Sequence, residues 1–163
     1  MSSLVIGRPN RFLDALPGTV RNQLDAIAVP KDFPQGAVLF QEGTEHDDVY
    51  LVLEGRVRLE MFVRDRGRLP IMTVGPGDLA GWSPLFGGHP MTATAIALEP
   101  VTTLSFDGQE LRELCQTEHE VGYHVMRQIA LVLSERLLAT RLQLLDLFLE
   151  HQPLSGQIVD PEC

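Results

Sequence analysis

Two patterns of apolar residues divide the chain into a strand-rich part and a helical part. From Gly36 to about Phe106, apolar residues alternate with polar ones or form short β-branched bursts, as over 49–53, 57–63 and 92–96. Such runs are typical of β-strands. Glycines punctuate them at short intervals, often beside Pro or Asp, which is the turn chemistry of a compact antiparallel barrel or sandwich.

The pattern then becomes helical. Asp107 is placed to cap a helix over 109–115, because Glu110 lies three residues further on, as in a capping box. A second helix is predicted over 118–150, since neither Gly nor Pro interrupts residues 123–151. At about 1.5 Å per residue, this helix is longer than a domain of this size needs to cover its own core.

The long predicted helix carries two nearly opposite apolar stripes when it is placed on a 3.6-residue repeat. One stripe can pack on the strand-rich part. The simplest way to bury the other stripe is to pair it with a second copy of the chain in a two-stranded seam. We therefore predict a homodimer; the alternative is that the N-terminal segment 1–31 covers the free stripe. The predicted dimer seam is Leu131, Leu138, Leu142, Leu145 and Leu149, and the opposite stripe is Met126, Leu133, Leu137, Leu144 and Phe148.

Composition and charge narrow the class of protein. The 163 residues are 44% hydrophobic and 21% charged, which is typical of a globular domain. No apolar run approaches the roughly 20 residues of a membrane span or resembles a signal peptide, so we predict a cytoplasmic protein without a membrane partner. The net charge of −9 repels nucleic-acid phosphates. Cys115 and Cys163 form no CxxC pair and predict neither a disulfide scaffold nor a zinc ribbon.

Several short motifs follow one another in the strand-rich part: Phe33-Pro34-Gln35-Gly36, Phe40-Gln41-Glu42-Gly43, Asp48–Gly55, Pro76-Gly77-Asp78 and Gly81, before the closing pair of helices. In this order they resemble the cyclic-nucleotide-binding domain, as found in the cyclic AMP receptor protein family and in the regulatory subunit of protein kinase A. The resemblance covers about residues 33–148. It implies a mainly β fold with helices: an eight-stranded antiparallel, jelly-roll-like β-roll, a short helix and a long C-terminal helix. It also implies a phosphate-binding cassette between two strands.

We therefore expect three segments along the chain. They are an N-terminal helical segment over 1–31, the β-roll with its C-terminal helices over 32–150, and a polar tail over 151–163. The residues after the long helix are too few for a helix-turn-helix, so we expect a stand-alone domain without direct DNA binding. A transcriptional role would then pass through a protein partner, for example a longer relative paired across the Leu131 stripe.

The predicted cassette lacks both of its charged anchors. The resemblance implies a Gly-Glu pair whose carboxylate meets the ribose 2′-hydroxyl, and an Arg that neutralises the cyclic phosphate. Gly81 matches, but Trp82 stands at the Glu position and Met91 at the Arg position. Asp78 belongs to the preceding Pro-Gly-Asp turn and does not replace the carboxylate. Losing two hydrogen bonds to charged groups removes roughly 3–6 kcal/mol, or two to four decades of affinity, so we predict poor binding of cyclic AMP and cyclic GMP.

Two interpretations of the altered cassette stay open. If Trp82 fills the vacated cavity, the domain is a regulatory or scaffolding module with a degenerate pocket. Alternatively, Trp82 and Met91 line a site for a different flat or apolar ligand, with polar contacts from Thr92 and the amides that follow it. Ser83 as an N-cap with Pro84 at the first helical position also predicts a helix start, where backbone N–H groups bind anions. The candidate ligand-binding residues are Gly81, Trp82, Ser83, Met91, Thr92 and Ala93.

No arrangement of catalytic residues emerges from the sequence. It holds neither a nucleophile elbow nor a Gly-rich phosphate loop with Lys, and its histidines form no pair that would bind the metal of a jelly-roll enzyme, the nearest rival by fold. The acidic cluster over 42–48 is better explained as a solvated turn than as a cation site. Residues 64–68, rich in arginine, predict a hairpin tip. We therefore predict no enzymatic activity, no metal and no cofactor.

Overall fold

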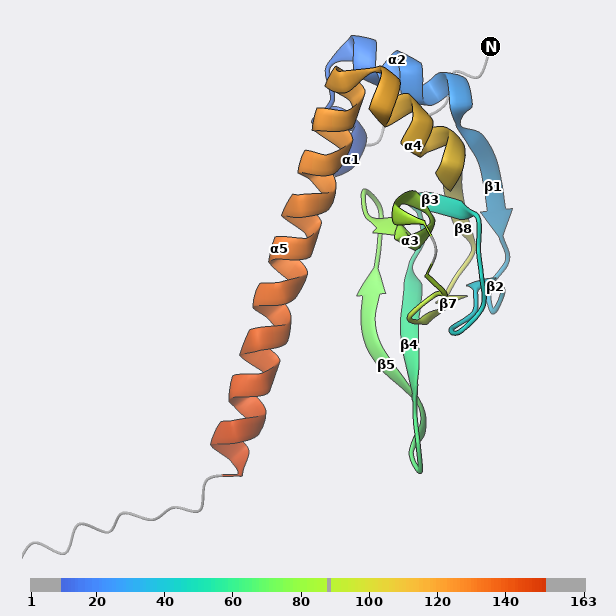
Figure 1. The fold of residues 1–163 in the computed structure, drawn as a ribbon. Helices are drawn as coiled ribbons and strands as arrows, with labels where there is room; N and C mark the ends of the chain where they lie inside the picture. Colours follow the sequence, from blue (N-terminus) through green and yellow to red (C-terminus); the bar gives the residue numbers. More distant parts are fainter. Residues whose placement is uncertain (1–9, 88, 152–163) are drawn as a thin grey trace, which may run out of the picture. The chain divides into compact units, whose positions relative to one another are not determined.

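Within the residues that the computed structural model describes, 10–87 and 89–151, eight strands form two four-stranded antiparallel sheets (Figure 1). The first sheet has the order β1–β8–β3–β6 and the second the order β2–β7–β4–β5. This architecture confirms the predicted β-roll. The strands are β1 Val29–Phe33, β2 Val38–Phe40, β3 Asp48–Glu54, β4 Val57–Val63, β5 Gly67–Val74, β6 Leu79–Ala80, β7 Thr94–Ala97 and β8 Val101–Asp107.

The helices of the described residues are α1 Arg11–Asp14, α2 Gly18–Ile27, α3 Ser83–Phe86, α4 Gly108–Thr117 and α5 His119–Glu150. α4 begins as predicted, because the Asp107 carboxylate accepts a hydrogen bond from the Glu110 N–H at 2.9 Å. The prediction of a long uninterrupted helix is also confirmed by α5. α3 packs against β3 and α4 against β8, and α2 lies beside α4 at one end of the roll (Figure 1).

The core of the roll consists of apolar side chains from both sheets and of Met91 and Ala93, which come just before β7. Strand β3 is buried from Val49 to Leu53, and its Tyr50 and Val52 belong to this core. Alternation along the strand directs Val49 and Leu51 to the opposite face of the first sheet. The core cluster is Phe33, Leu39, Phe40, Tyr50, Val52, Val57, Leu59, Val74, Ala80, Met91, Ala93, Ala95, Ala97 and Val101.

Strand β1 differs from the predicted helical segment over 1–31. It begins at Val29 and pairs antiparallel with β8, from Val29↔Ser105 to Phe33↔Val101. Of its five residues only Phe33 is buried, so the strand has no apolar alternation that would reveal it. Its proline is tolerated because β1 is an edge strand. Residues 1–9 of the predicted segment lie outside the described residues.

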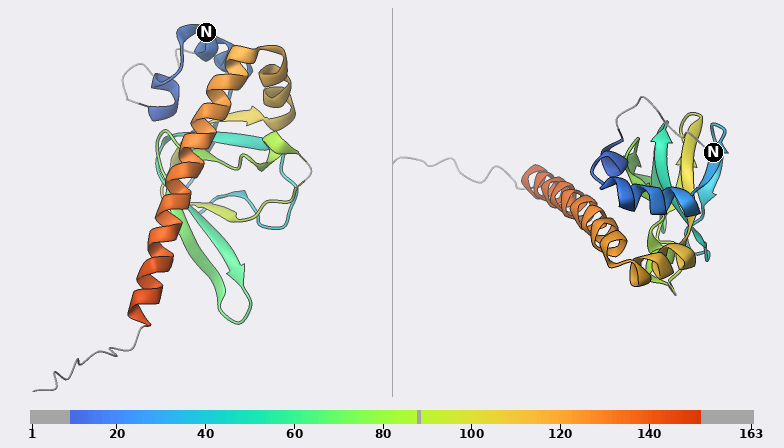
Figure 2. Two further views of the ribbon diagram at one scale, coloured as in Figure 1. Left: turned by 60° about the vertical axis from the view of Figure 1, so that its left-hand side comes forward. Right: turned by 90° about the horizontal axis from the view of Figure 1, so that it is seen from above.

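The hairpin of β4 and β5 extends beyond the other strands (Figure 2). Its tip holds the arginines of 64–68, and Asp65 adopts a positive φ of 69° there. The predicted hairpin tip is therefore confirmed.

The chain divides into two compact units, 1–128 and 129–163. The first holds the roll, α1–α4 and the first turns of α5. In the second, the described residues continue α5, and every residue from 137 to 150 is exposed. The predicted polar tail, apart from His151, lies outside the described residues, as does Cys163. No described helix combines the length and apolar character that crossing a membrane requires.

Candidate functional site

The predicted cassette is the segment 81–93, which connects β6 to β7 and contains α3. Its helix starts one residue earlier than predicted. Trp82 is the N-cap, with φ −74° and ψ −6°, so Ser83 and Pro84 are the first helical residues, and no side chain caps the helix. The prediction of Ser83 as N-cap is therefore wrong, because Trp82 already has helical backbone angles. A four-residue helix with proline in its first turn offers few free N–H groups to an anion.

The core side of the cassette is built around Met91. This side chain is only 4% exposed and lies in the core cluster with Phe40 and Ala93. Two hydrogen bonds to the β2–β3 loop fix its backbone: Met91 N–H donates to the Thr44 carbonyl at 2.9 Å, and Gly43 N–H donates to the Met91 carbonyl at 2.8 Å. The position that the resemblance assigns to a phosphate-binding arginine is thus occupied by a buried thioether.

Gly81 allows the start of the cassette to pass closely over these apolar side chains. Its φ is +70°, and a Cβ at this position would lie 2.8 Å from Phe40 Cε1 and 3.4 Å from Met91 Cε. A larger residue would therefore meet both the strained backbone and the phenyl ring. The sequence alone did not assign a role to Phe40, although Phe40 belongs to one of the family motifs.

The other candidate residues lie further from this contact. Trp82 and Ser83 are half-buried, and the Thr92 side chain is exposed. The structure therefore brings Gly81, Met91 and Ala93 together and leaves Thr92 outside the core. Met91, rather than the Trp82 indole, occupies the core beside Gly81.

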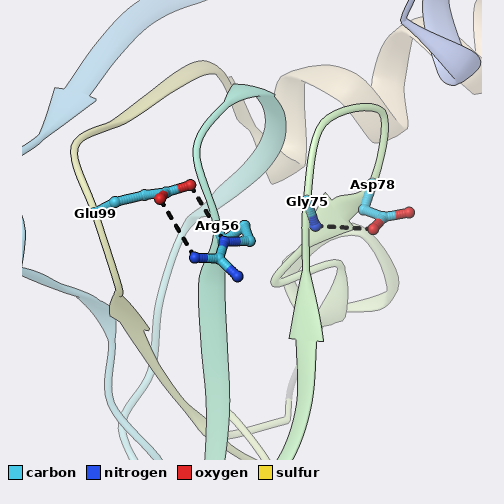
Figure 3. A network of polar contacts seen from close by, with 4 residues as sticks. All are labelled: Arg56, Gly75, Asp78 and Glu99. Atoms are coloured by element: carbon cyan, nitrogen blue, oxygen red, sulfur yellow. Dashed lines mark hydrogen bonds and ion pairs between the residues drawn. The ribbon is translucent and has the colours of Figure 1, made fainter.

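No acid of the preceding turn replaces the missing carboxylate. The Asp78 carboxylate accepts a hydrogen bond from Gly75 N–H at 3.0 Å and closes the turn that the sequence predicts (Figure 3). Figure 3 also shows Arg56, between β3 and β4, paired with Glu99, between β7 and β8, with 3.3 Å between Arg56 Nε and Glu99 Oε1. Both groups are therefore engaged away from the cassette.

A second arginine pair lies on β4. Arg58 Nη2 is 2.6 Å from Glu60 Oε1, and the Glu60 side chain is buried. These two residues alternate with Val57 and Leu59, which belong to the core cluster. Alternation directs the ion pair to the opposite face of the sheet. The Arg58–Glu60 pair therefore does not face the core cluster that contains Met91.

The side of the cassette that faces α4 is polar. A cavity of about 360 Å³ separates it from the β2–β3 loop and the start of α4. Arg112 of α4 reaches the cassette backbone here, since a Cβ on Gly87 would lie 2.6 Å from Arg112 Nη1. No sequence signal could have paired Arg112 with Gly87, because the contact joins separate elements. The lining residues are Glu45, His46, Asp47, Pro84, Gly87, His89, Asp107, Gln109 and Arg112.

His46 connects this cavity to the core. Its Nε2 is 3.0 Å from the hydroxyl oxygen of Tyr50, a fully buried residue. Burial lowers the pKa of His46, against the opposing effect of the Asp48 carboxylate. Burial, together with Asp48, raises the pKa of Tyr50 to about 12. Among residues 10–87 and 89–151, no group of three or more His, Cys, Asp or Glu side chains is arranged to hold a metal ion.

The family model described as the cyclic nucleotide-binding domain matches residues 30–118. The chain belongs to the cyclic nucleotide-binding domain family. A relative described as a CRP-like cAMP-activated global transcriptional regulator, from Mycobacterium tuberculosis, is 32% identical over 125 residues, which cover 76% of this chain and 54% of that protein. The chain thus spans about half the length of this relative.

Solved structures of similar proteins share the fold. The N-terminal domain of a transcriptional regulator from Streptomyces coelicolor has a TM-score of 0.65 and 31% identity, covering 77% of this chain and 90% of that one. A cyclic nucleotide-binding domain from Methylobacillus flagellatus has a TM-score of 0.75 and 21% identity, covering 88% and 78%, and shows the shared fold alone. The family predicted from the motifs is therefore confirmed.

Proposed function

We propose that this domain is a non-enzymatic regulatory module whose degenerate cassette binds cyclic AMP and cyclic GMP poorly. The proposal depends above all on one observation: Met91, which the resemblance assigns to the family's arginine position, is 4% exposed in an apolar core. A cyclic phosphate placed there would lose its hydration without gaining a cation, which is unfavourable by several kcal/mol. A cytoplasmic location stays a prediction from the sequence.

Restoring both anchors tests this proposal. The double variant W82E/M91R should bind cyclic AMP about 100-fold or more tightly than the matched variant W82Q/M91L, because two hydrogen bonds to charged groups are regained. Isothermal titration calorimetry measures both affinities, and circular dichroism checks that both variants are folded. A folded W82E/M91R protein without any gain would contradict the assignment of Trp82 and Met91 to the anchor positions.

The proposed module acts as a homodimer through α5. The predicted seam supports this, since its side chains are all exposed in the single chain: Leu131 42%, Leu138 58%, Leu142 54%, Leu145 57% and Leu149 68%. The opposite stripe is exposed as well, with Leu137 at 53% and Phe148 at 71%. Contiguous exposed apolar side chains of this extent mark interaction surfaces.

Sedimentation velocity tests the dimer. L138E places a charge in the apolar seam and should yield monomers, whereas Q143E adds the same charge to α5 away from both stripes and should leave dimers. A dimer that survives L138E would contradict the seam. A dimer that is lost in both variants would show that added charge on α5, not the stripe, decides association.

The second candidate is a sensor for a flat or apolar small molecule. It is favoured by the half-buried position of Trp82 at the start of α3, which leaves part of this residue accessible. Native mass spectrometry of protein purified without added ligand tests it. A bound organic mass that disappears in W82A would support this function, and the bare mass of the chain would count against it.

A further inference from the structure

A second cavity, of about 530 Å³, lies among α3, α4 and the first turns of α5. It is lined by Phe86 of α3, by Arg112 and Cys115 of α4, and by Tyr123 and Met126 of α5. All of these residues belong to the unit 1–128. We call this cavity the helix groove.

The walls of the helix groove are in close backbone contact. A Cβ on Gly108, at the start of α4, would lie 2.6 Å from Pro84 Cβ of α3. A Cβ on Gly122 of α5 would lie 2.5 Å from the Cys115 carbonyl oxygen of α4. Only glycine allows such approaches, so these two positions fix the three helices against one another. The groove is therefore formed before any ligand arrives, which lowers the entropic cost of binding.

The surface of the groove is mainly apolar. Phe86 is 54% exposed, Tyr123 63% and Met126 37%. Burial raises the pKa of the Cys115 thiol, which keeps this side chain uncharged. Large apolar side chains that gather around a cavity of this size are typical of a ligand site.

The polar residues of the lining are Arg112, Gln116 and His119. Arg112 is half-buried and, among the described residues, has no hydrogen-bond or ion-pair partner. A guanidinium group presents parallel N–H donors that match a carboxylate in a bidentate pair. Arg112 also lines the polar cavity, where Glu45 and Asp47 carry negative charge. These carboxylates disfavour a doubly charged phosphate and favour a ligand with a single negative charge.

We infer that the helix groove binds a small monocarboxylate with an apolar body. The carboxylate accepts hydrogen bonds from Arg112, and the apolar body packs against Phe86, Tyr123 and Met126. Such a ligand contacts the cassette helix α3 and the beginning of α5 at once, so its binding stabilises their arrangement. This site is separate from the core side of the cassette and does not depend on whether cyclic nucleotides bind there.

The probe for this site is 3-phenylpropionate, with the neutral 3-phenylpropanamide as its matched control. The full chain carries ¹³C-labelled methionine methyl groups, so Met126 reports on the helix groove and Met91 on the core side of the cassette. We expect a saturable shift of the Met126 methyl signal with the acid, binding of the amide weaker by about tenfold or more, and an unchanged Met91 signal. Equal affinities for the acid and the amide, no saturable shift of Met126, or a shift at Met91 in its place would overturn the inference.

Variants test the role of the cation. R112Q should weaken binding of the acid by about tenfold or more and leave binding of the amide unchanged. R127Q removes an exposed arginine that does not line the groove, and should bind the acid as the unmodified chain does. Unchanged acid binding in a folded R112Q protein would overturn the assignment of the carboxylate to Arg112.

2-Phenylethyl phosphate should bind no more tightly than the acid, and tighter binding would overturn the preference for a single charge. The comparison of acid and amide on the unmodified chain stands even if R112Q fails to fold.

Discussion

The two sides of the cassette, segment 81–93, have opposite chemistry. Its core side consists of Gly81, Met91 and Ala93 against the Phe40 ring. Its other side borders a cavity lined by carboxylates, two histidines and Arg112. The resemblance implies two anchoring charges in this segment, at the positions of Trp82 and Met91. In this chain the core side is apolar, and the charged groups near the cassette are on the side of α4.

The cassette thus combines a glycine turn, a short helix and a return to β7 with two sides of different chemistry. Burial of the Met91 side chain contributes about 1.5–3 kcal/mol to folding. The roll therefore gains stability at the position that the resemblance assigns to a phosphate-binding arginine.

The largest expected effect comes from a charge placed on the core side. M91R should lower the free energy of unfolding by about 3 kcal/mol or more, because its guanidinium would be buried without a partner. Urea denaturation measures the loss. T92R, at the next and exposed position, is the matched control and should change stability little. If M91R were as stable as T92R, the core side would admit a hydrated charge and the contrast between the two sides would fail.

A smaller effect is expected from crowding at Gly81. G81A adds a Cβ at 2.8 Å from Phe40 Cε1, on a backbone with φ +70°. G67A, in the hairpin, has a similar φ of +77° but no atom within 4 Å of its Cβ. Thermal or chemical unfolding should therefore show a loss of about 1 kcal/mol for G67A and about 2–4 kcal/mol for G81A. Equal losses would mean that backbone strain alone acts and that Gly81 does not lie tightly over the ring.

The smallest effect concerns His46, beside the polar cavity. Its pKa is lower in the folded chain than its ordinary value of 6.5, so the unfolded chain takes up this proton first as the pH falls. The stability that neutral His46 contributes is therefore complete above about pH 6.5 and declines below it. H46Q, whose amide can still meet the Tyr50 hydroxyl, should flatten this decline in unfolding experiments between pH 7 and pH 5. H119Q, at an exposed position, should retain it. A decline of the same size in H46Q and the unmodified chain would assign the pH dependence to other groups.

The sequence predicts those features that depend on local signals. Asp107 and Glu110 mark the start of α4 because capping is a contact between near neighbours. The fold follows from the order of the motifs, and the assignment of Met91 to the arginine position stays a prediction from the resemblance. Strand β1 could not be predicted from the sequence, because an edge strand with four exposed residues needs no apolar alternation.

Contacts between distant segments could not be read from the sequence. The approach of Arg112 to Gly87 depends on how α4 packs beside the cassette. The division of roles between Trp82 and Met91 depends on which side chain enters the core, and either of these large apolar residues could have filled it. In the structure, Met91 and not Trp82 belongs to the core cluster.

Calorimetric titration of the unmodified protein with cyclic AMP tests the central claim most directly. The apolar core side predicts no saturable binding at micromolar ligand and a dissociation constant of about 1 mM or weaker. A single-site dissociation constant in the micromolar range would contradict it, because binding of that strength requires charged anchors that the core side of this cassette does not present.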